Sequence, residues 1–85
     1  MSATIQSMSE PGSLDGRRRE AIHGLRNVLN TSTMNAHLAR LLEHDTQRRQ
    51  ACLDLIIEEC AKGSRLLQQL SELDEALAAD ARQRA

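Results

Sequence analysis

The segment His44-Asp45-Thr46-Gln47-Arg48 lies between two long stretches in which apolar residues recur at helical spacing. Asp45 is a residue type that accepts hydrogen bonds from the first backbone N–H groups of a helix, so it is a predicted N-cap. Because a short polar connection joins antiparallel neighbours in helical proteins, the sequence predicts a helical hairpin with its loop at this segment.

The stretches on either side of this loop each predict one long helix. Residues 14–43 contain no proline, and the second helix is expected from Thr46 to about Ala79. The expected buried face of the first helix is Ile22, Leu25, Leu29, Ser32, Ala36, Ala39 and Leu42. That of the second helix is Leu53, Ile56, Cys60, Gly63, Leu67, Leu70 and Leu77, widened by Leu66 and Leu73 and broken at Asp74.

The width of these apolar faces predicts an assembly. A chain of 85 residues has room for one small domain, and without Phe, Tyr or Trp its core must come from aliphatic side chains, Met and Cys. Two helices alone leave one flank of each face uncovered, whereas two paired hairpins cover all four faces. The predicted fold is therefore all-α: an antiparallel two-helix hairpin that dimerises into a four-helix bundle.

The ends of the chain and its overall charge exclude several classes of protein. Residues 1–13 are rich in serine and without period, so a disordered tail is expected there, with a frayed C-terminus at 80–85. We find neither a secretory signal nor the roughly 20 apolar residues that span a bilayer, which predicts a cytoplasmic protein away from membranes. The net charge of -1 and the absence of aromatic side chains predict no nucleic-acid partner.

Neither the cysteines nor the later histidines predict a site. Cys52 and Cys60 lie eight residues apart, about 12 Å along a helix, which is too far for an intrachain disulfide. Both thiols are expected to be buried. His37 and His44 are about 10 Å apart along the helix axis, so no metal site is expected from them.

The candidate site is a polar stripe on the first helix. Its members are His23, Arg26, Asn27 and Asn30, extended towards the N-terminus by Arg19 and Glu20. An exposed imidazole is mostly neutral at cellular pH, and its free ring nitrogen can act as a nucleophile. A guanidinium binds phosphate oxygens, and an amide can orient a water molecule. The same residues also suit an ordinary solvated helix face, and their spacing does not separate the two interpretations.

The segment His23-Gly24-Leu25-Arg26-Asn27-Val28-Leu29-Asn30 resembles the H-box of sensor histidine kinases, in which an acidic residue, an apolar residue, Arg or Lys, Thr or Asn, Pro and Leu follow the phospho-accepting histidine. Residues 53–60 and 65–70 look like the second helix of the same dimerisation and phosphoacceptor domain. The resemblance extends over about residues 15–78. It implies a four-helix homodimer in two-component signalling.

The resemblance also implies roles for the polar stripe. His23 would be the phosphoacceptor, assisted by Arg26, and Asn27 would position water for dephosphorylation of a partner. Gly24 replaces the family's acidic residue and Val28 its proline, which weakens the case for autophosphorylation. Glu20 is expected to orient the imidazole in place of the missing acid.

The resemblance further implies which molecules this chain would meet. The receiver domain of a response regulator would dock on the turns after the histidine, at Asn30, Thr31, Met34, Asn35 and Leu38. Met34 and Leu38 lie off the predicted buried face, so they suit either extra core or an exposed binding patch. No segment resembles an ATP-binding domain. We therefore expect no bound cofactor, and ATP only through a separate kinase domain in trans, so the module would not be an autonomous enzyme.

Two other functions remain open at this point. A monomeric histidine phosphotransfer protein carries the motif His-x-Leu-Lys-Gly, which residues 23–27 also resemble. A non-catalytic helical-hairpin adaptor or kinase inhibitor would need no phosphoacceptor.

Overall fold

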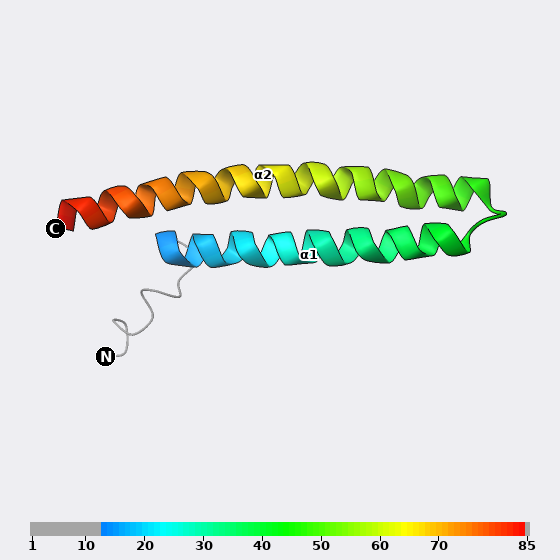
Figure 1. Cartoon of the computed structure of the whole chain (residues 1–85), viewed down its shortest axis with the longest axis horizontal. Coiled ribbons are helices and arrows are strands. Elements are labelled where there is room, and N and C mark those ends of the chain that lie inside the picture. The colour runs from blue at the N-terminus through cyan, green and yellow to red at the C-terminus, as the bar shows by residue number, and fades with distance from the viewer. Residues whose placement is uncertain (1–12, 85) are drawn as a thin grey trace, which may run out of the picture.

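The structure is a computed structural model that describes residues 13–84 as two antiparallel helices joined by a tight loop (Figure 1). Helix α1 spans Leu14–Leu41 and helix α2 spans Thr46–Arg84. The predicted all-α hairpin, with its loop at residues 42–45, is confirmed. Residues 1–12 of the expected disordered tail lie outside the described residues.

Side chains cap the first turn of both helices. Ser13 Oγ accepts a hydrogen bond of 2.9 Å from the backbone N–H of Gly16. Asp45 Oδ1 accepts one of 3.1 Å from the backbone N–H of Arg48, which confirms Asp45 as the predicted N-cap. Each cap satisfies an N–H that has no partner within its helix, a contribution of about 1 kcal/mol. Ser13, expected to end the tail, therefore begins the ordered hairpin.

The two helices pack along a seam of alternating three- and four-residue steps. The seam residues of α1 are Ala21, Leu25, Val28, Ser32, Asn35, Ala39 and Leu42. Those of α2 are Cys52, Ile56, Glu59, Gly63, Leu66, Leu70, Leu73 and Leu77. All are buried or half-buried, and the small residues among them bring the helices close together. A Cβ on Gly63 would lie 3.2 Å from Val28 Cγ1.

On each helix, three of the residues predicted to be buried lie outside the seam, and the residue directly before each of them lies in the seam instead. Val28 is 5% exposed whereas Leu29 is 65% exposed. The predicted seam residues that lie outside the observed seam are Ile22, Leu29 and Ala36 on α1 and Leu53, Cys60 and Leu67 on α2. Both sets recur every seven residues, directly beside a seam residue. Periodicity alone does not distinguish these residues from the seam residues beside them. At three of the six positions the seam residue, Ala21, Val28 or Cys52, is smaller than the predicted one, which allows the helices to approach more closely there.

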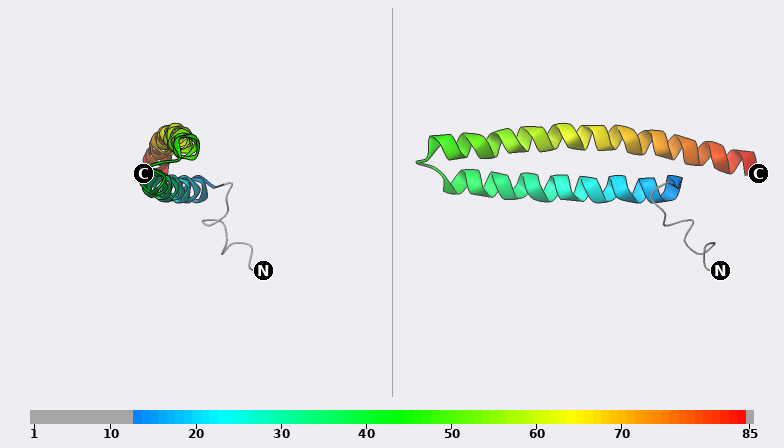
Figure 2. Two further views of the ribbon diagram at one scale, coloured as in Figure 1. Left: turned by 90° about the vertical axis from the view of Figure 1, so that its right-hand side faces the viewer. Right: turned by 180° about the vertical axis from the view of Figure 1, so that it is seen from behind.

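The hairpin is a single layer of helices (Figure 2). Its shortest dimension is 13 Å, close to one helix diameter. Within residues 13–84, no large side chain is fully buried. Domains are normally built from at least two packed layers, so this hairpin alone leaves much of its apolar surface in contact with water.

Helix α2 is longer than predicted. It continues past Ala79 to Arg84, where Arg84 Nη2 and Asp80 Oδ2 form an ion pair of 3.2 Å. Residues 80–84, where the sequence predicted a frayed end, belong to this helix. With 39 residues against 28, α2 extends beyond the start of α1 (Figure 1). Neither helix is long and apolar enough to cross a membrane.

Candidate functional site

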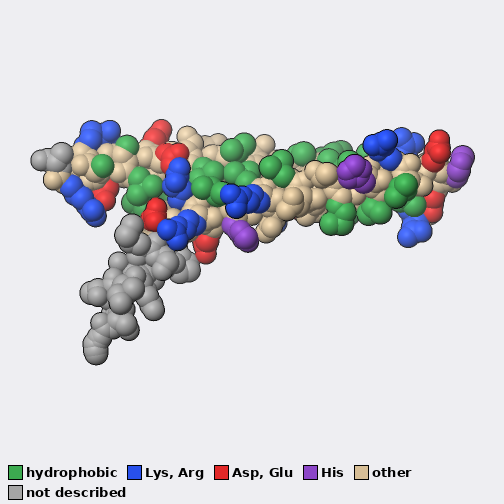
Figure 3. All heavy atoms as spheres, turned by 60° about the horizontal axis from the view of Figure 1, so that its bottom comes forward, with side chains coloured by type: hydrophobic (Ala, Val, Ile, Leu, Met, Phe, Trp, Pro, Cys, Tyr) green, Lys and Arg blue, Asp and Glu red, His purple; other side chains and the backbone are tan. Residues whose placement is uncertain are grey.

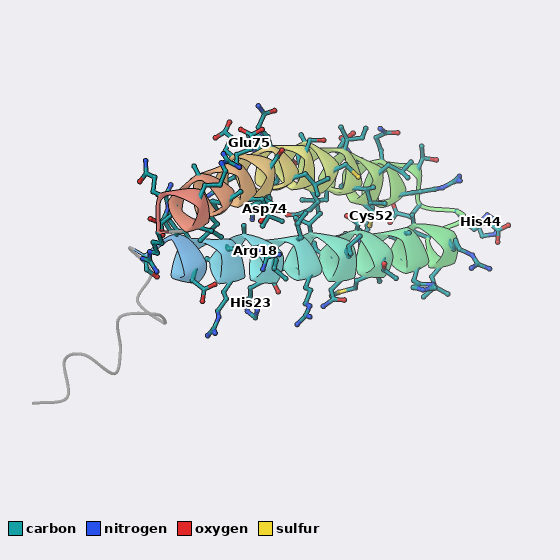
Figure 4. The ribbon with its side chains drawn as sticks, turned by 60° about the vertical axis from the view of Figure 1, so that its left-hand side comes forward. Arg18, His23, His44, Cys52, Asp74 and Glu75 are labelled. Carbon is teal, nitrogen blue, oxygen red and sulfur yellow. The ribbon has the colours of Figure 1, made fainter. Side chains whose placement is uncertain are left out.

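His23 occupies the side of α1 that points away from α2 (Figure 4). Its side chain is exposed, and Asn30 and His37 follow it at seven-residue steps, also exposed. No hydrogen bond or ion pair among residues 13–84 engages the imidazole. His23 is therefore an accessible side chain on an uninterrupted helix.

Arg26 and Asn27 lie one turn beyond His23, on either side of its line along the helix. Both are exposed. Residues three and four positions apart on a helix have Cβ atoms about 5–6 Å apart, so both side chains can approach a group bound to the imidazole. Glu20 is exposed one turn before the histidine but forms no hydrogen bond with it in the described chain. The predicted orienting role of Glu20 stays a prediction.

Gly24, directly after the histidine, lies at the edge of the seam rather than on the exposed face. A Cβ at this position would be 3.0 Å from Leu66 Cδ1 and 3.5 Å from Leu66 Cδ2. A side chain here requires the end of the Leu66 side chain to move by a few tenths of an ångström. The position at which sensor kinases carry an acidic residue is therefore crowded by Leu66, and glycine avoids this close contact.

The predicted docking residues divide into an exposed set and a buried one. Met34 is 59% exposed and Leu38 is 42% exposed, so of the two interpretations the structure favours an exposed patch over extra core. Asn30 is exposed and Thr31 is half-buried. Asn35 is only 8% exposed, and its Nδ2 donates a 2.9 Å hydrogen bond to the Thr31 carbonyl. Asn35 was wrongly assigned to the docking surface, because it lies in the seam between the helices.

Helix α2 also contributes to this patch, which the sequence did not predict. Leu55 is exposed and directly precedes the seam residue Ile56, as Leu38 directly precedes the seam residue Ala39. Antiparallel helices are related by a local two-fold axis, so equivalent positions along the seam share one face. Leu38 and Leu55 therefore lie on the same face, which we call the Leu38 face: Thr31, Met34, Leu38 and Leu55. Such a pair of equivalent positions can be recognised only when the residues that form the seam of each helix are known.

The opposite side of the hairpin is also apolar. Here a hollow of about 370 Å³ is lined by Leu25, Val28, Leu29, Cys60, Gly63, Ser64 and Leu67. Cys60 is exposed on this side, which corrects the expectation that both thiols are buried, whereas Cys52 is buried in the seam. We call this surface the Leu29 face and define it by Ile22, Leu29, Ala36, Leu53, Cys60 and Leu67. On the face that Figure 3 shows, hydrophobic side chains gather along the middle of the molecule, and several charged side chains lie towards its two ends.

One polar atom in the seam has no partner. Ser32 Oγ is buried and forms no hydrogen bond with the described part of the chain.

As for metals, the described residues contain no group of three or more His, Cys, Asp or Glu side chains that could hold an ion.

Comparison with known proteins adds no relative: no family model, curated protein or solved structure matches the chain.

Proposed function

We propose that this chain is a histidine phosphoacceptor module of two-component signalling. The observation that carries the proposal is an unengaged, exposed imidazole on an uninterrupted helix, with the exposed Arg26 and Asn27 one turn away. His23 accepts a phosphoryl group and exchanges it with an aspartate of a response-regulator receiver domain. The H-box resemblance of residues 23–30 supports the same assignment.

The transfer step uses the neutral imidazole as nucleophile. Its free ring nitrogen attacks the phosphorus of an aspartyl phosphate, and an N–P bond forms as the P–O bond breaks. The electron pair of the broken bond stays on the aspartate carboxylate, and the proton on the other ring nitrogen is shared with water. Arg26 balances the negative charge of the phosphoryl group. In a separate reaction, Asn27 orients a water molecule that attacks the phosphorus of the regulator's aspartyl phosphate, so that the aspartate carboxylate leaves and inorganic phosphate is released.

The contact between Gly24 and Leu66 supports transfer rather than autophosphorylation. An acid next to the histidine would assist proton removal during attack on ATP, whereas this chain has Gly24 there, at a position crowded by Leu66. In our proposal ATP reaches His23 only through a kinase domain supplied in trans. The chain itself holds no cofactor.

The regulator docks beside the phosphoacceptor, on the Leu38 face. Exposed apolar side chains near polar ones are typical of binding surfaces. Met34 and Leu38 of α1 supply apolar contact, Leu55 of α2 extends it, and Asn30 lies at its edge towards His23. The hairpin pairs with a second copy to form a four-helix bundle, because one layer of helices does not cover its own apolar surface.

The experiment is phosphoryl transfer to the full chain from a panel of phosphorylated receiver domains and ATP-loaded kinase domains of the same genome. We expect an acid-labile, base-stable label at His23 that is lost in His23→Gln. His37→Gln is the matched control, because His37 lies on the same outward line of α1 and is equally free of partners in the described structure. Equal labelling of both variants would reject His23 as the phosphoacceptor.

A second candidate is a helical-hairpin adaptor or kinase inhibitor without chemistry. The exposed apolar side chains on both faces of the hairpin favour it, because binding alone would account for them. If no donor labels His23 while a kinase is still recovered bound to the chain, this candidate replaces the phosphoacceptor.

A further inference from the structure

Two arginines lie on the same side of His23, one turn before it and one turn after it. Arg19 is four residues before the histidine and Arg26 is three residues after it, and both are exposed. Residues at these spacings are neighbours on a helix surface, with Cβ atoms about 5–6 Å apart. The imidazole is therefore flanked by two guanidinium groups, of which the transfer step described above uses only that of Arg26.

The direction of helical side chains brings Arg19 into the surroundings of a phosphoryl group on His23. Side chains on an α-helix lean towards its N-terminus, over the preceding turn. The imidazole therefore extends over the turn that contains Arg19 and Glu20, and Arg26 leans back towards it from the following turn. Because His23 points away from α2 (Figure 4), no charged side chain among residues 46–84 faces it. Glu20 repels a phosphoryl group, whereas the two guanidiniums attract it.

Arg19 has another partner while His23 is unmodified. Its Nη2 lies 3.8 Å from Oδ2 of Asp15, four residues earlier. The side chains of Arg19 and Asp15 are 68% and 36% exposed, so water and salt screen this long ion pair. Arg26 forms no ion pair within residues 13–84. Arg26 is thus free to bind an arriving anion, and Arg19 needs only to leave a weak pair.

A phosphoryl group competes well with the carboxylate of Asp15. Phosphorylated side chains carry a charge of about −1.5 to −2 at neutral pH and three oxygens that accept hydrogen bonds. Arginine presents its donors in a planar fork that matches phosphate oxygens. We propose that phosphorylation of His23 transfers Arg19 from Asp15 to the phosphoryl group, which Arg19 and Arg26 then bind from two sides. This inference rests on the proposed function and adds to it a second phosphate-binding residue and an exchange of ion pairs.

The chain contains a matched histidine without this arrangement. His37 lies on the same outward line of α1 as His23, and Arg40 follows it by three residues, the spacing found at His23. Four residues before His37, however, lies the exposed and uncharged Thr33, where His23 has Arg19. A phosphoryl group on His37 would therefore meet one guanidinium instead of two.

The test uses chemical phosphorylation, which needs no partner protein. Phosphoramidate phosphorylates an exposed imidazole, because a ring nitrogen attacks the phosphorus and ammonia leaves. In the full chain with His37→Gln and His44→Gln, His23 is the one remaining histidine of three. The phosphorus NMR shift, followed against pH, then gives the midpoint at which the phosphohistidine takes up a proton. Neighbouring cations favour the form with more negative charge and lower this midpoint.

The first comparison separates Arg19 from a nearby arginine. Arg19→Gln should raise the midpoint by about 0.5 pH unit, the effect of one unit charge at about 6 Å in water. Arg17→Gln is the matched control, because Arg17 is an exposed arginine of the same turn that lies on another side of α1. Its removal changes the net charge equally and should leave the midpoint unchanged. Equal midpoints in the two variants would overturn the role of Arg19.

The exchange with Asp15 predicts a shift of opposite sign. Asp15→Asn should lower the midpoint, because Arg19 no longer has a competing carboxylate. Asp15 is eight residues from His23, about 12 Å along the axis, so its direct effect on the phosphoryl group is small. In an Arg19→Gln background the same change should therefore have almost no effect. A shift that persists without Arg19 would reject the exchange.

Thr33→Arg is the converse test. In the chain with His23→Gln and His44→Gln, this substitution places a second arginine beside His37. The midpoint of phosphorylated His37 should fall by about 0.5 pH unit. An unchanged midpoint would show that an arginine four residues before a histidine does not reach its phosphoryl group, and would overturn the inference.

The two proposals fail independently. If no protein donor labels His23, the phosphoacceptor is removed, whereas the chemically phosphorylated chain still reports the effect of Arg19. Labelling of His23 by a donor, together with equal midpoints for Arg19→Gln and Arg17→Gln, would do the reverse.

Discussion

Arg18 Nε donates a hydrogen bond of 2.9 Å to Asp74 Oδ1, which ties the second turn of α1 to a residue 56 positions later in the chain. Figure 4 shows the two side chains facing each other between the helices. In the sequence, Asp74 only interrupts an apolar spacing. In the fold, Asp74 directly follows the buried Leu73 and links α2 to α1 near the open end of the hairpin.

This ion pair is expected to contribute little to stability on its own. The side chains of Arg18 and Asp74 are 45% and 58% exposed, so water and salt screen their attraction. Arg18→Ala should lower the free energy of unfolding by roughly 0.5 kcal/mol, and less in high salt, as measured by urea titration. In an Asp74→Ala background the same change should have almost no effect. An undiminished effect there would show that the pair is not the cause.

Gly24 and Leu66 are expected to be energetically coupled. Gly24→Ala gains about 1 kcal/mol of helix propensity, but its Cβ would displace the Leu66 side chain 3.0 Å away. The substitution should therefore stabilise the hairpin more in a Leu66→Ala background than in the wild type. A double-mutant cycle measures this coupling. Equal effects in both backgrounds would mean that Leu66 adapts without strain.

The buried hydroxyl of Ser32 is expected to destabilise the seam. Ser32→Ala removes a buried group without a hydrogen-bond partner among the described residues and should raise the free energy of unfolding by about 1 kcal/mol. Thr33→Ala is the control, because Thr33 is exposed on the same turn and reports helix propensity alone. A gain no larger at Ser32 than at Thr33 would contradict the prediction.

Asn27 is expected to matter for dephosphorylation more than for transfer. Asn27→Ala should leave the labelling of His23 close to wild type and slow the loss of phosphate from the regulator at least tenfold. Asn30→Ala, an exposed amide one turn further on, should leave that rate unchanged. Equal slowing by both variants would assign the effect to docking rather than to water positioning.

The Leu38 face is expected to determine regulator affinity. Leu38→Asp should weaken binding of the receiver domain by a factor of ten or more, because it places a charge within the apolar contact. Ile57→Asp provides the comparison, since Ile57 is an exposed apolar residue bordering the Leu29 face. Titration calorimetry measures both affinities. Weakening by Ile57→Asp alone would place the regulator on the opposite side of the hairpin.

The sequence was sufficient to predict the helices, the loop and the Asp45 cap, because these depend on local chemistry. The phase of the seam depends on packing between the helices. Two neighbouring seven-residue series of α1, through Val28 and through Leu29, both satisfy a helical period. The series through Val28 is buried, and Gly63 of α2 admits Val28 at close range. The assignment of Asn35 to the docking surface failed for the same reason.

His23 is exposed whether the series through Val28 or the series through Leu29 is buried, because it belongs to neither. Its surroundings were less predictable. The contact between Gly24 and Leu66, and the place of Leu55 beside Leu38, join residues of different helices, and only the register of the hairpin reveals them.

The hairpin topology also has a kinetic consequence. Seam contacts near Asp45 close a loop of only a few residues, whereas the contact between Arg18 and Asp74 spans almost the whole described chain. Closing short loops first costs the least chain entropy. Folding is therefore expected to start at the capped loop, and the pairing of the two helices is expected to proceed from there towards the open end. His23 lies nearer to the open end of the hairpin than to the loop. The helices should separate first at this open end, where the backbone amide hydrogens should exchange fastest.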